Sequence, residues 1–326
     1  CCWCGGERGE RAHVAAMTAL TTIRRAAAQA AGRYAQFTAP SSGHTTTTIV
    51  AGGLRTLATA TELYNDWWIY LPAASAADKI RTVLSYAPST STTLGTLTTD
   101  GRVYSASSVP NSKVVELHGL FPPFSDDLSL YDWTSAINDA LKRLWLTVEF
   151  TITPTASATR HALTSQSWIL SENQVRQVGF LTTGEVRAAT DPYRDRWVRG
   201  SVEQDGATLY LHHPNRTFGT NETIYVRAAK RAYDHCKPSA GAYGDQSGLA
   251  LETDETPVTV DMVMWGAMVE AAENLRNDLS DASVDHLLRR QDTWRRRWST
   301  ALQIHNGRLP KVTFKPRRYF WQDRRW

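Results

Sequence analysis

The sequence predicts an α+β fold in which helices alternate with two β-rich modules and the chain ends in an extended tail. Apolar residues recur at helical spacing in four separate segments. Short β-branched or alternating runs, separated by turn residues, fill the stretches between them. Beyond the last helical segment, Pro310 and Pro316 stand in a basic, aromatic sequence without helical periodicity. The 326 residues are enough for a sizeable core and allow two or three domains.

The N-terminal part of the chain is expected to hold one helix and one β-rich module. Residues 1–16 show no periodicity and form an irregular extension, with Met17 as a natural-looking start. Leu20, Ile23 and Tyr34 fall at helical spacing and predict a helix over residues 17–37. Residues 44–118 contain strands at 45–50, 67–71, 79–86 and 93–98, typical of a small sandwich or barrel. In the third strand, positions 80, 82, 84 and 86 are expected to share one face.

The middle of the chain is expected to hold a helix, a β-rich insertion and a loop. A capping box formed by Ser129 and Asp132 opens a central helix over residues 127–145. The insertion covers residues 146–235, and strands on either side of Gln204-Asp205-Gly206 predict a hairpin there. Residues 236–255 are rich in Gly and Ser and are expected to form a flexible loop.

The C-terminal part is expected to form a helical hairpin followed by a tail. Thr256 caps a helix that has Pro257 at its first position, and a second apolar stripe begins near residue 281. The short link between these stripes predicts an antiparallel pair of helices over residues 256–305. Residues 306–326 form the tail.

Charge is distributed unevenly along the chain. The net charge is +4, from 36 Lys and Arg against 32 Asp and Glu. Residues 289–326 alone contain twelve Lys or Arg and two Asp, a net charge of +10, so the rest of the chain carries −6. A basic end on a mildly acidic body points to an acidic partner surface or to nucleic acid.

The sequence offers no catalytic, cofactor or metal site. It lacks the phosphate-binding loops, the nucleophile elbow and the zinc-protease motif. Three of the four cysteines are Cys1, Cys2 and Cys4, and no second cysteine or histidine pair completes a zinc site with them. Cys236 is the single cysteine of the body, which fits folding in a reducing cytoplasm. We therefore expect neither an enzyme nor a cofactor, and the lack of a long apolar run predicts no membrane-spanning helix.

The tail is the strongest candidate for a binding segment. Exposed aromatic residues gain nothing unless a partner covers them, and Tyr, Trp and Arg dominate interface anchors. We interpret the tail as a docking arm that orders on binding, with nucleic-acid contact as the rival interpretation. A cluster of three arginines in the last helix is a possible phosphate or partner contact, although a solvated helix face explains it equally well. The cluster is Arg295, Arg296 and Arg297, and the docking residues are Lys311, Phe314, Lys315, Arg317, Arg318, Tyr319, Phe320, Trp321, Arg324, Arg325 and Trp326.

Two stretches of the chain carry a resemblance to a known family. They are the pattern YNDWWIYLP…DKIRTVLSYAPSTSTTL, beginning at Tyr64, and WTSAINDALKRLW, beginning at Trp133. With the order of elements over most of residues 17–326, the chain resembles the head-to-tail adaptor (connector, or head-completion) proteins of tailed double-stranded DNA bacteriophages. It departs from the family pattern in its residues 1–16 and in its larger β insertion at about 146–235.

The resemblance implies a virion structural protein made in the host cytoplasm. Such proteins form a ring, commonly of twelve subunits, beneath the portal protein and around the packaged DNA. The resemblance also implies that residues 17–36, 129–144, 257–278 and 281–305 form a helical bundle. The β parts would face the next neck or tail protein, and residues 306–326 would insert into the portal. Two alternatives stay open: another neck or tail component, such as a stopper or tail-tube protein, and a nucleic-acid-binding protein that uses the basic tail.

Overall fold

The computed structural model divides the chain into two compact units, each described here by itself. The larger unit contains Ala15–Arg143 and His235–Leu302, and the smaller contains Cys1–Val14, Leu144–Asp234 and Gln303–Trp326. The structure describes residues 18–45, 47–51, 54, 64–74, 79–89, 94–100, 110–120, 129–163, 168–170, 174–182, 201–205, 208–212, 217, 222–275, 281–307 and 315–316.

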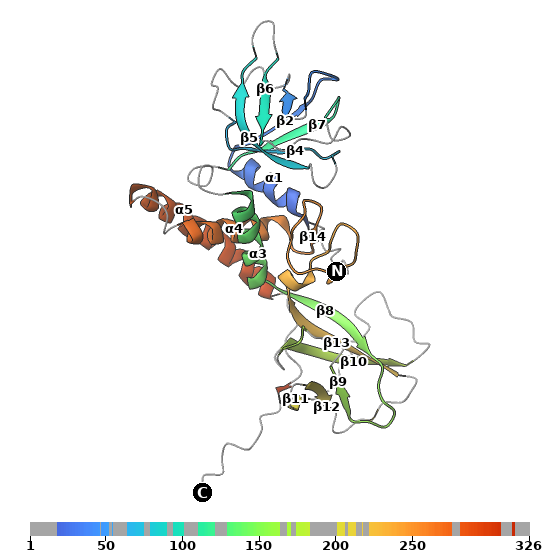
Figure 1. Ribbon diagram of the computed structural model, residues 1–326. Coiled ribbons are helices and arrows are strands. Elements are labelled where there is room, and N and C mark those ends of the chain that lie inside the picture. The colour runs from blue at the N-terminus through green and yellow to red at the C-terminus, as the bar shows by residue number, and fades with distance from the viewer. Residues whose placement is uncertain are drawn as a thin grey trace, which may run out of the picture. The chain divides into compact units, whose positions relative to one another are not determined.

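The predicted architecture, a helical bundle with two small β modules, is wrong. Within the described residues, four α-helices stand against fifteen strands, and the chain is a β-rich mixed α/β protein built on antiparallel sheets (Figure 1). The helices do pack on one another, but in the larger unit they accompany a six-stranded sheet that has a hydrophobic core of its own. The bundle followed from the family resemblance, whereas strand content is what the Thr-rich sequence favours.

A six-stranded antiparallel sheet forms the first half of the larger unit. Its order is β2-β7-β4-β5-β6-β3, so neighbours in the sheet are distant in sequence. The strands are β2 (Tyr34–Thr38), β3 (Thr48–Val50), β4 (Trp68–Tyr70), β5 (Ile80–Ala87), β6 (Thr96–Thr99) and β7 (Val114–His118). Alternate residues such as Ile69, Val83 and Leu117 are fully buried in one core. The strands predicted near residues 45, 67, 79 and 93 are confirmed.

The first helix is shorter than predicted. Helix α1 (Leu20–Ala30) ends where Gly32 adopts a φ of +68°, which favours glycine because other residues carry a Cβ. The Arg33 N–H donates to the Ala28 carbonyl and the Gly32 N–H donates to the Gln29 carbonyl, which together make a Schellman motif. The chain then enters β2, so the prediction of a helix over residues 17–37 was wrong for its C-terminal part.

Three more helices contribute residues to the larger unit. These are α3 (Leu130–Arg143), α4 (Val260–Leu275) and α5 (Asp281–Gly307). Helix α4 is apolar on nearly all sides and packs against α1 and α3. A Cβ added to Gly266 would lie 2.8 Å from the Ala140 Cβ and 3.0 Å from the Trp298 ring, so α3, α4 and α5 approach closely at this glycine.

The segment predicted to be a flexible loop has a defined structure. The Asp254 carboxylate accepts hydrogen bonds from the backbone N–H groups of Ala250 and Leu251 at 2.8 and 2.7 Å. Glu255 and Thr256 form β14, which pairs antiparallel with β1 (Thr18–Ala19), the strand that directly precedes α1 in the sequence. The carboxylate contacts order the segment internally, and the strand pair secures its C-terminal end to the residues just before α1.

The smaller unit encloses its core between two sheets. One sheet has the order β10-β13-β8, from Val175–Thr182, Glu222–Arg231 and Trp145–Ile152. The other has the order β15-β11-β12-β9, from Lys315–Pro316, Ser201–Asp205, Thr208–His212 and Arg160–Ala162. Buried residues of both sheets, including Val178, Leu211 and Val226, share one hydrophobic cluster. The predicted hairpin near Asp205 is confirmed, because β11 and β12 pair antiparallel.

Candidate interaction surfaces

The C-terminal tail is described at two residues, and both belong to a strand. Lys315 and Pro316 form β15, which lies parallel to β11 with Lys315 opposite Ser201. The other proposed docking residues, Lys311, Phe314, Arg317, Arg318, Tyr319, Phe320, Trp321, Arg324, Arg325 and Trp326, lie outside the described residues. The tail therefore adds a strand at the edge of a sheet, as extended peptides do when they dock on a partner.

The three consecutive arginines of α5 point to different surroundings. Arg295 pairs with Glu273 of α4 at 2.8 Å, and both side chains are partly exposed. The Arg297 guanidinium lies over the Trp265 ring, 4.5 Å from the ring centroid. Arg296 is exposed. The structure thus separates the predicted cluster into a surface ion pair, a cation–π contact and a solvated side chain.

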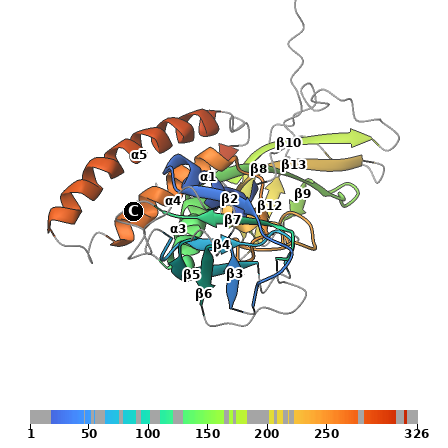
Figure 2. The same ribbon diagram turned by 90° about the horizontal axis from the view of Figure 1, so that it is seen from above.

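A groove of about 490 Å³ opens between the C-terminal end of α1 and helices α4 and α5. Figure 2 shows α5 extending beside α1 and α4. The apolar floor comprises the buried side chains of Met268 and Trp294 and the half-buried Trp265. The remaining lining residues are Ala30, Ala31, Arg289, Arg290, Thr293 and Arg297.

The rim of this groove is cationic. Arg289 and Arg297 are exposed, and Arg290 is half-buried. Among the described residues, Arg289 and Arg297 form no ion pair with a carboxylate, and their charges remain available to a ligand. An apolar floor under guanidinium groups suits an anionic group that carries an aromatic or apolar part.

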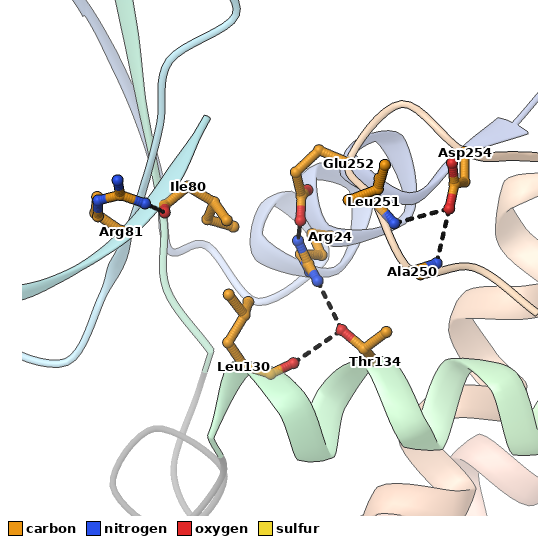
Figure 3. Close-up of polar contacts among 9 residues, drawn as sticks. All are labelled: Arg24, Ile80, Arg81, Leu130, Thr134, Ala250, Leu251, Glu252 and Asp254. Atoms are coloured by element: carbon orange, nitrogen blue, oxygen red, sulfur yellow. Dashed lines mark hydrogen bonds and ion pairs between the residues drawn. The ribbon is translucent and has the colours of Figure 1, made fainter. Parts of the chain in front are cut away.

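Polar side chains are buried where α1 meets its neighbours (Figure 3). Arg24 is 2% exposed and forms an ion pair with Glu252, which is 7% exposed. Arg24 also donates to the Thr134 hydroxyl at 2.7 Å, and that hydroxyl donates to the Leu130 carbonyl at 2.9 Å. Burial lowers the pKa of Arg24, while the charge and hydrogen bond of Glu252 oppose this shift. These contacts join α1, α3 and the segment before β14 rather than forming an open site.

A second buried set lies between α1 and β7. Arg25 donates to both Glu116 carboxylate oxygens, at 2.9 and 2.7 Å, and His118 lies 2.9 Å from the same carboxylate. Burial alone would raise the pKa of Glu116, but hydrogen bonds from His118 and Arg25 and the Arg25 charge lower it below its ordinary value. The rings of Tyr34 and Tyr70 lie 5.6 and 6.0 Å from the His118 ring. Since Arg25 belongs to α1 while Glu116 and His118 belong to β7, the set holds the helix on the sheet.

The described part of the chain holds a free cysteine but neither a metal-ligand cluster nor a membrane-spanning helix. No group of three His, Cys, Asp or Glu side chains there can hold a metal ion. Cys236 is a buried free thiol. No described helix is long and apolar enough to cross a membrane.

Part of the groove can be recognised from the residue order alone. The arginine run of α5 was visible, but its division among a carboxylate, an indole ring and solvent depends on where α4 lies. The exposed aromatic Tyr131, 81% accessible beside the exposed Asp132, was hidden because both residues belong to an ordinary helix start. Only fractional exposure distinguishes such a residue from the core residue Trp133 next to it.

Comparison of the chain with protein-family models, with curated proteins and with solved structures finds no match. What the protein does is therefore inferred from its own residues. The features that bear on this inference are a basic aromatic tail with an edge strand at Lys315 and Pro316, and a groove with an apolar floor and an arginine rim.

Proposed function

We propose that this protein is a virion structural protein, a head-to-tail adaptor that forms a ring beneath the portal protein of a tailed bacteriophage. In this role it joins the capsid to the neck or tail around the channel for packaged DNA. A ring subunit needs complementary faces that close by rotation, and it needs no catalytic group. The proposal rests on the resemblance in the stretches that begin at Tyr64 and Trp133 and on the binding features of the C-terminal region.

The observation that carries the proposal is the composition of the tail together with its strand pairing at Lys315 and Pro316. Residues 289–326 hold a net charge of +10, and the last 13 residues contain five aromatic side chains. Lys315 and Pro316 pair as a parallel strand with the edge of β11, so this segment can take the extended form used in strand addition. Basic and aromatic side chains on an extended segment supply both charge and anchors for docking on the portal.

Deletion of residues 310–326 tests the proposal. We expect the truncated chain to lose binding to rings of the portal protein from the same genome, as measured by co-sedimentation. Unchanged portal binding by the truncated chain would overturn the docking role of the tail.

Two further variants separate the contribution of charge from that of aromatic anchors. One changes Phe314, Tyr319, Phe320, Trp321 and Trp326 to Ser, and the other changes Arg317, Arg318, Arg324 and Arg325 to Gln. A docking arm requires the aromatic set at every salt concentration, because the anchors fill pockets in the partner. The arginine set contributes mainly at low salt.

Nucleic-acid binding is the second candidate function, and the concentration of positive charge in the tail favours it. It predicts that the isolated chain binds duplex DNA with an affinity that falls steeply with salt. Weak binding with a shallow salt dependence, together with tail-dependent portal binding, supports the adaptor. Tight, salt-steep DNA binding without portal binding supports the second candidate.

A further inference from the structure

The groove between α1, α4 and α5 has a complementary projection on the same chain. We propose that the start of α3, with Tyr131 as its anchor and Asp132 beside it, docks into this groove on a neighbouring copy of the protein. The inference rests on the proposed function, because it assigns the contact that joins subunits in the ring.

The projection is aromatic and acidic. Tyr131 is 81% exposed, so its own chain leaves most of the ring uncovered. Asp132 is also exposed, and its carboxylate accepts a hydrogen bond from the Ser129 backbone N–H at 3.2 Å in a capping box. This box fixes the helix start, so the two side chains are presented by a rigid element.

The groove offers the matching chemistry. A phenol ring entering it meets Met268 and the indole rings of Trp265 and Trp294, and aromatic pairs contribute beyond their buried area. The guanidinium of Arg297 already lies over one of these rings and can stack on a second. A carboxylate one residue along the projection then faces the cationic rim, where charge-assisted hydrogen bonds are strong.

Charge complementarity identifies a second copy as the occupant. The groove lies where the basic C-terminal region begins, while the projection belongs to the part of the chain that carries the excess of acidic residues. Duplex DNA would use the arginines but would leave the apolar floor uncovered. Because the groove and the projection are different surfaces, the contact is heterologous, and such contacts generate rings when the rotation closes.

A charge-swap mixture tests the proposal on the full chain. The first variant, Arg289→Glu with Arg297→Glu, has an acidic groove and a native projection. The second, Asp132→Lys, has a basic projection and a native groove, and it also loses the capping-box acceptor of the native side chain. We expect each alone to assemble about 100-fold more weakly than the unaltered chain, since like charges face each other at every contact. An equal mixture is expected to regain assembly, because every contact in an alternating ring then pairs opposite charges.

Two matched controls and one anchor variant accompany the mixture. Arg296→Glu makes the same kind of substitution at one position of α5 outside the groove, and Leu170→Ser removes another exposed apolar side chain, which is 82% accessible. Both controls are expected to assemble like the unaltered chain. Tyr131→Ser leaves the capping box intact and is expected to weaken assembly about 10-fold or more.

The readouts are sedimentation velocity of the protein alone and electron microscopy of the same samples on portal rings. The proposal is supported if assembly is weak for each charge variant by itself and recovers when the two variants are mixed. If each charge variant alone assembles like the unaltered chain, or if the mixture fails to recover assembly, the proposed contact is wrong. In that case, a ring of the unaltered chain on the portal would still support the proposed function. If the unaltered chain neither self-associates nor binds the portal, both proposals fail.

Discussion

Arg24 of α1 and Glu252 of the segment before β14 form an ion pair that is almost completely buried. The pair is incompletely satisfied, since the Arg24 Nε and the Glu252 Oε2 atoms are buried without a hydrogen-bond partner. Desolvation of two charges costs several kcal/mol, and it is offset only when their geometry and surrounding hydrogen bonds are good. The pair therefore fixes the position of α1 more than it adds net stability.

Removal of one partner of this pair is expected to be strongly destabilising. Glu252→Gln leaves the buried Arg24 charge without its counter-ion, which costs about 3–5 kcal/mol of the free energy of unfolding. Arg24→Met combined with Glu252→Leu is expected to recover most of this loss, because it removes both desolvation penalties. Hydrogen exchange of the α1 amides measures the change in the free energy of opening in both variants. Glu255→Gln, which breaks the more exposed pair with Lys237, is the control and should cost no more than about 1 kcal/mol.

The carboxylate of Glu116 predicts a loss of stability at acidic pH. Its pKa is lower in the folded protein, so the unfolded chain binds the proton more readily. The stabilisation is present above the ordinary pKa of a glutamate and is lost as the pH falls through the lowered folded value. Glu116→Gln is expected to reduce this pH dependence. Urea unfolding of both proteins between pH 7 and pH 3 measures it, and identical slopes would contradict the assignment.

In the smaller unit, Lys230 is expected to make the stability depend on pH in the alkaline range. Burial lowers its pKa despite the nearby Asp234, and its ammonium lies 5.1 Å from the Trp168 ring centroid. Between the lowered folded value and 10.5 the unfolded chain binds more protons, so stability rises with pH through that interval. Lys230→Met is expected to remove this rise and to be neutral or stabilising at pH 7. A loss above about 2 kcal/mol on unfolding would show that the charge itself is required.

The close approach of helices at Gly266 predicts that even a methyl group is harmful there. Alanine has the better helix propensity by about 1 kcal/mol, but the added Cβ would meet Ala140 and Trp298 at 2.8 and 3.0 Å. We expect Gly266→Ala to destabilise the larger unit by about 1–3 kcal/mol. The double change with Ala140→Gly moves the methyl group from α3 to α4. It should cost less than the sum of the single changes, and additive costs in thermal unfolding would place the strain elsewhere.

Strand positions could be predicted from the sequence more reliably than strand faces. Residues 80–86 alternate as expected for a strand, and β5 occupies that stretch. Between Val83 and Ser85 the register shifts, so Val83 and Tyr86 both enter the core while Leu84 is 54% exposed. A β-bulge inserts one residue into the alternation, and hydrophobic pattern alone does not reveal where it falls.

Helix ends and helix organisation show the same limit. Tyr34 continues the helical spacing of α1, but it lies in β2 because the chain turns at Gly32 and pairs with β7. The sequence identified four helical segments, yet their role beside a six-stranded sheet depends on pairings between residues far apart in the chain. Local periodicity contains no information on such pairings.

The candidate surfaces divide in the same way. Composition was enough to find the basic aromatic tail, whereas the groove requires α1, α4 and α5 to be brought together. The proposal that the groove accepts Tyr131 depends on the high exposure of that side chain, and exposure is a property of the folded chain.

Electron microscopy of the full chain mixed with portal rings from the same genome tests the adaptor proposal most directly. The proposal predicts a second ring, coaxial with the portal and attached at one end of it, that disappears when residues 310–326 are deleted. Portal rings that remain bare in the presence of excess protein would contradict it.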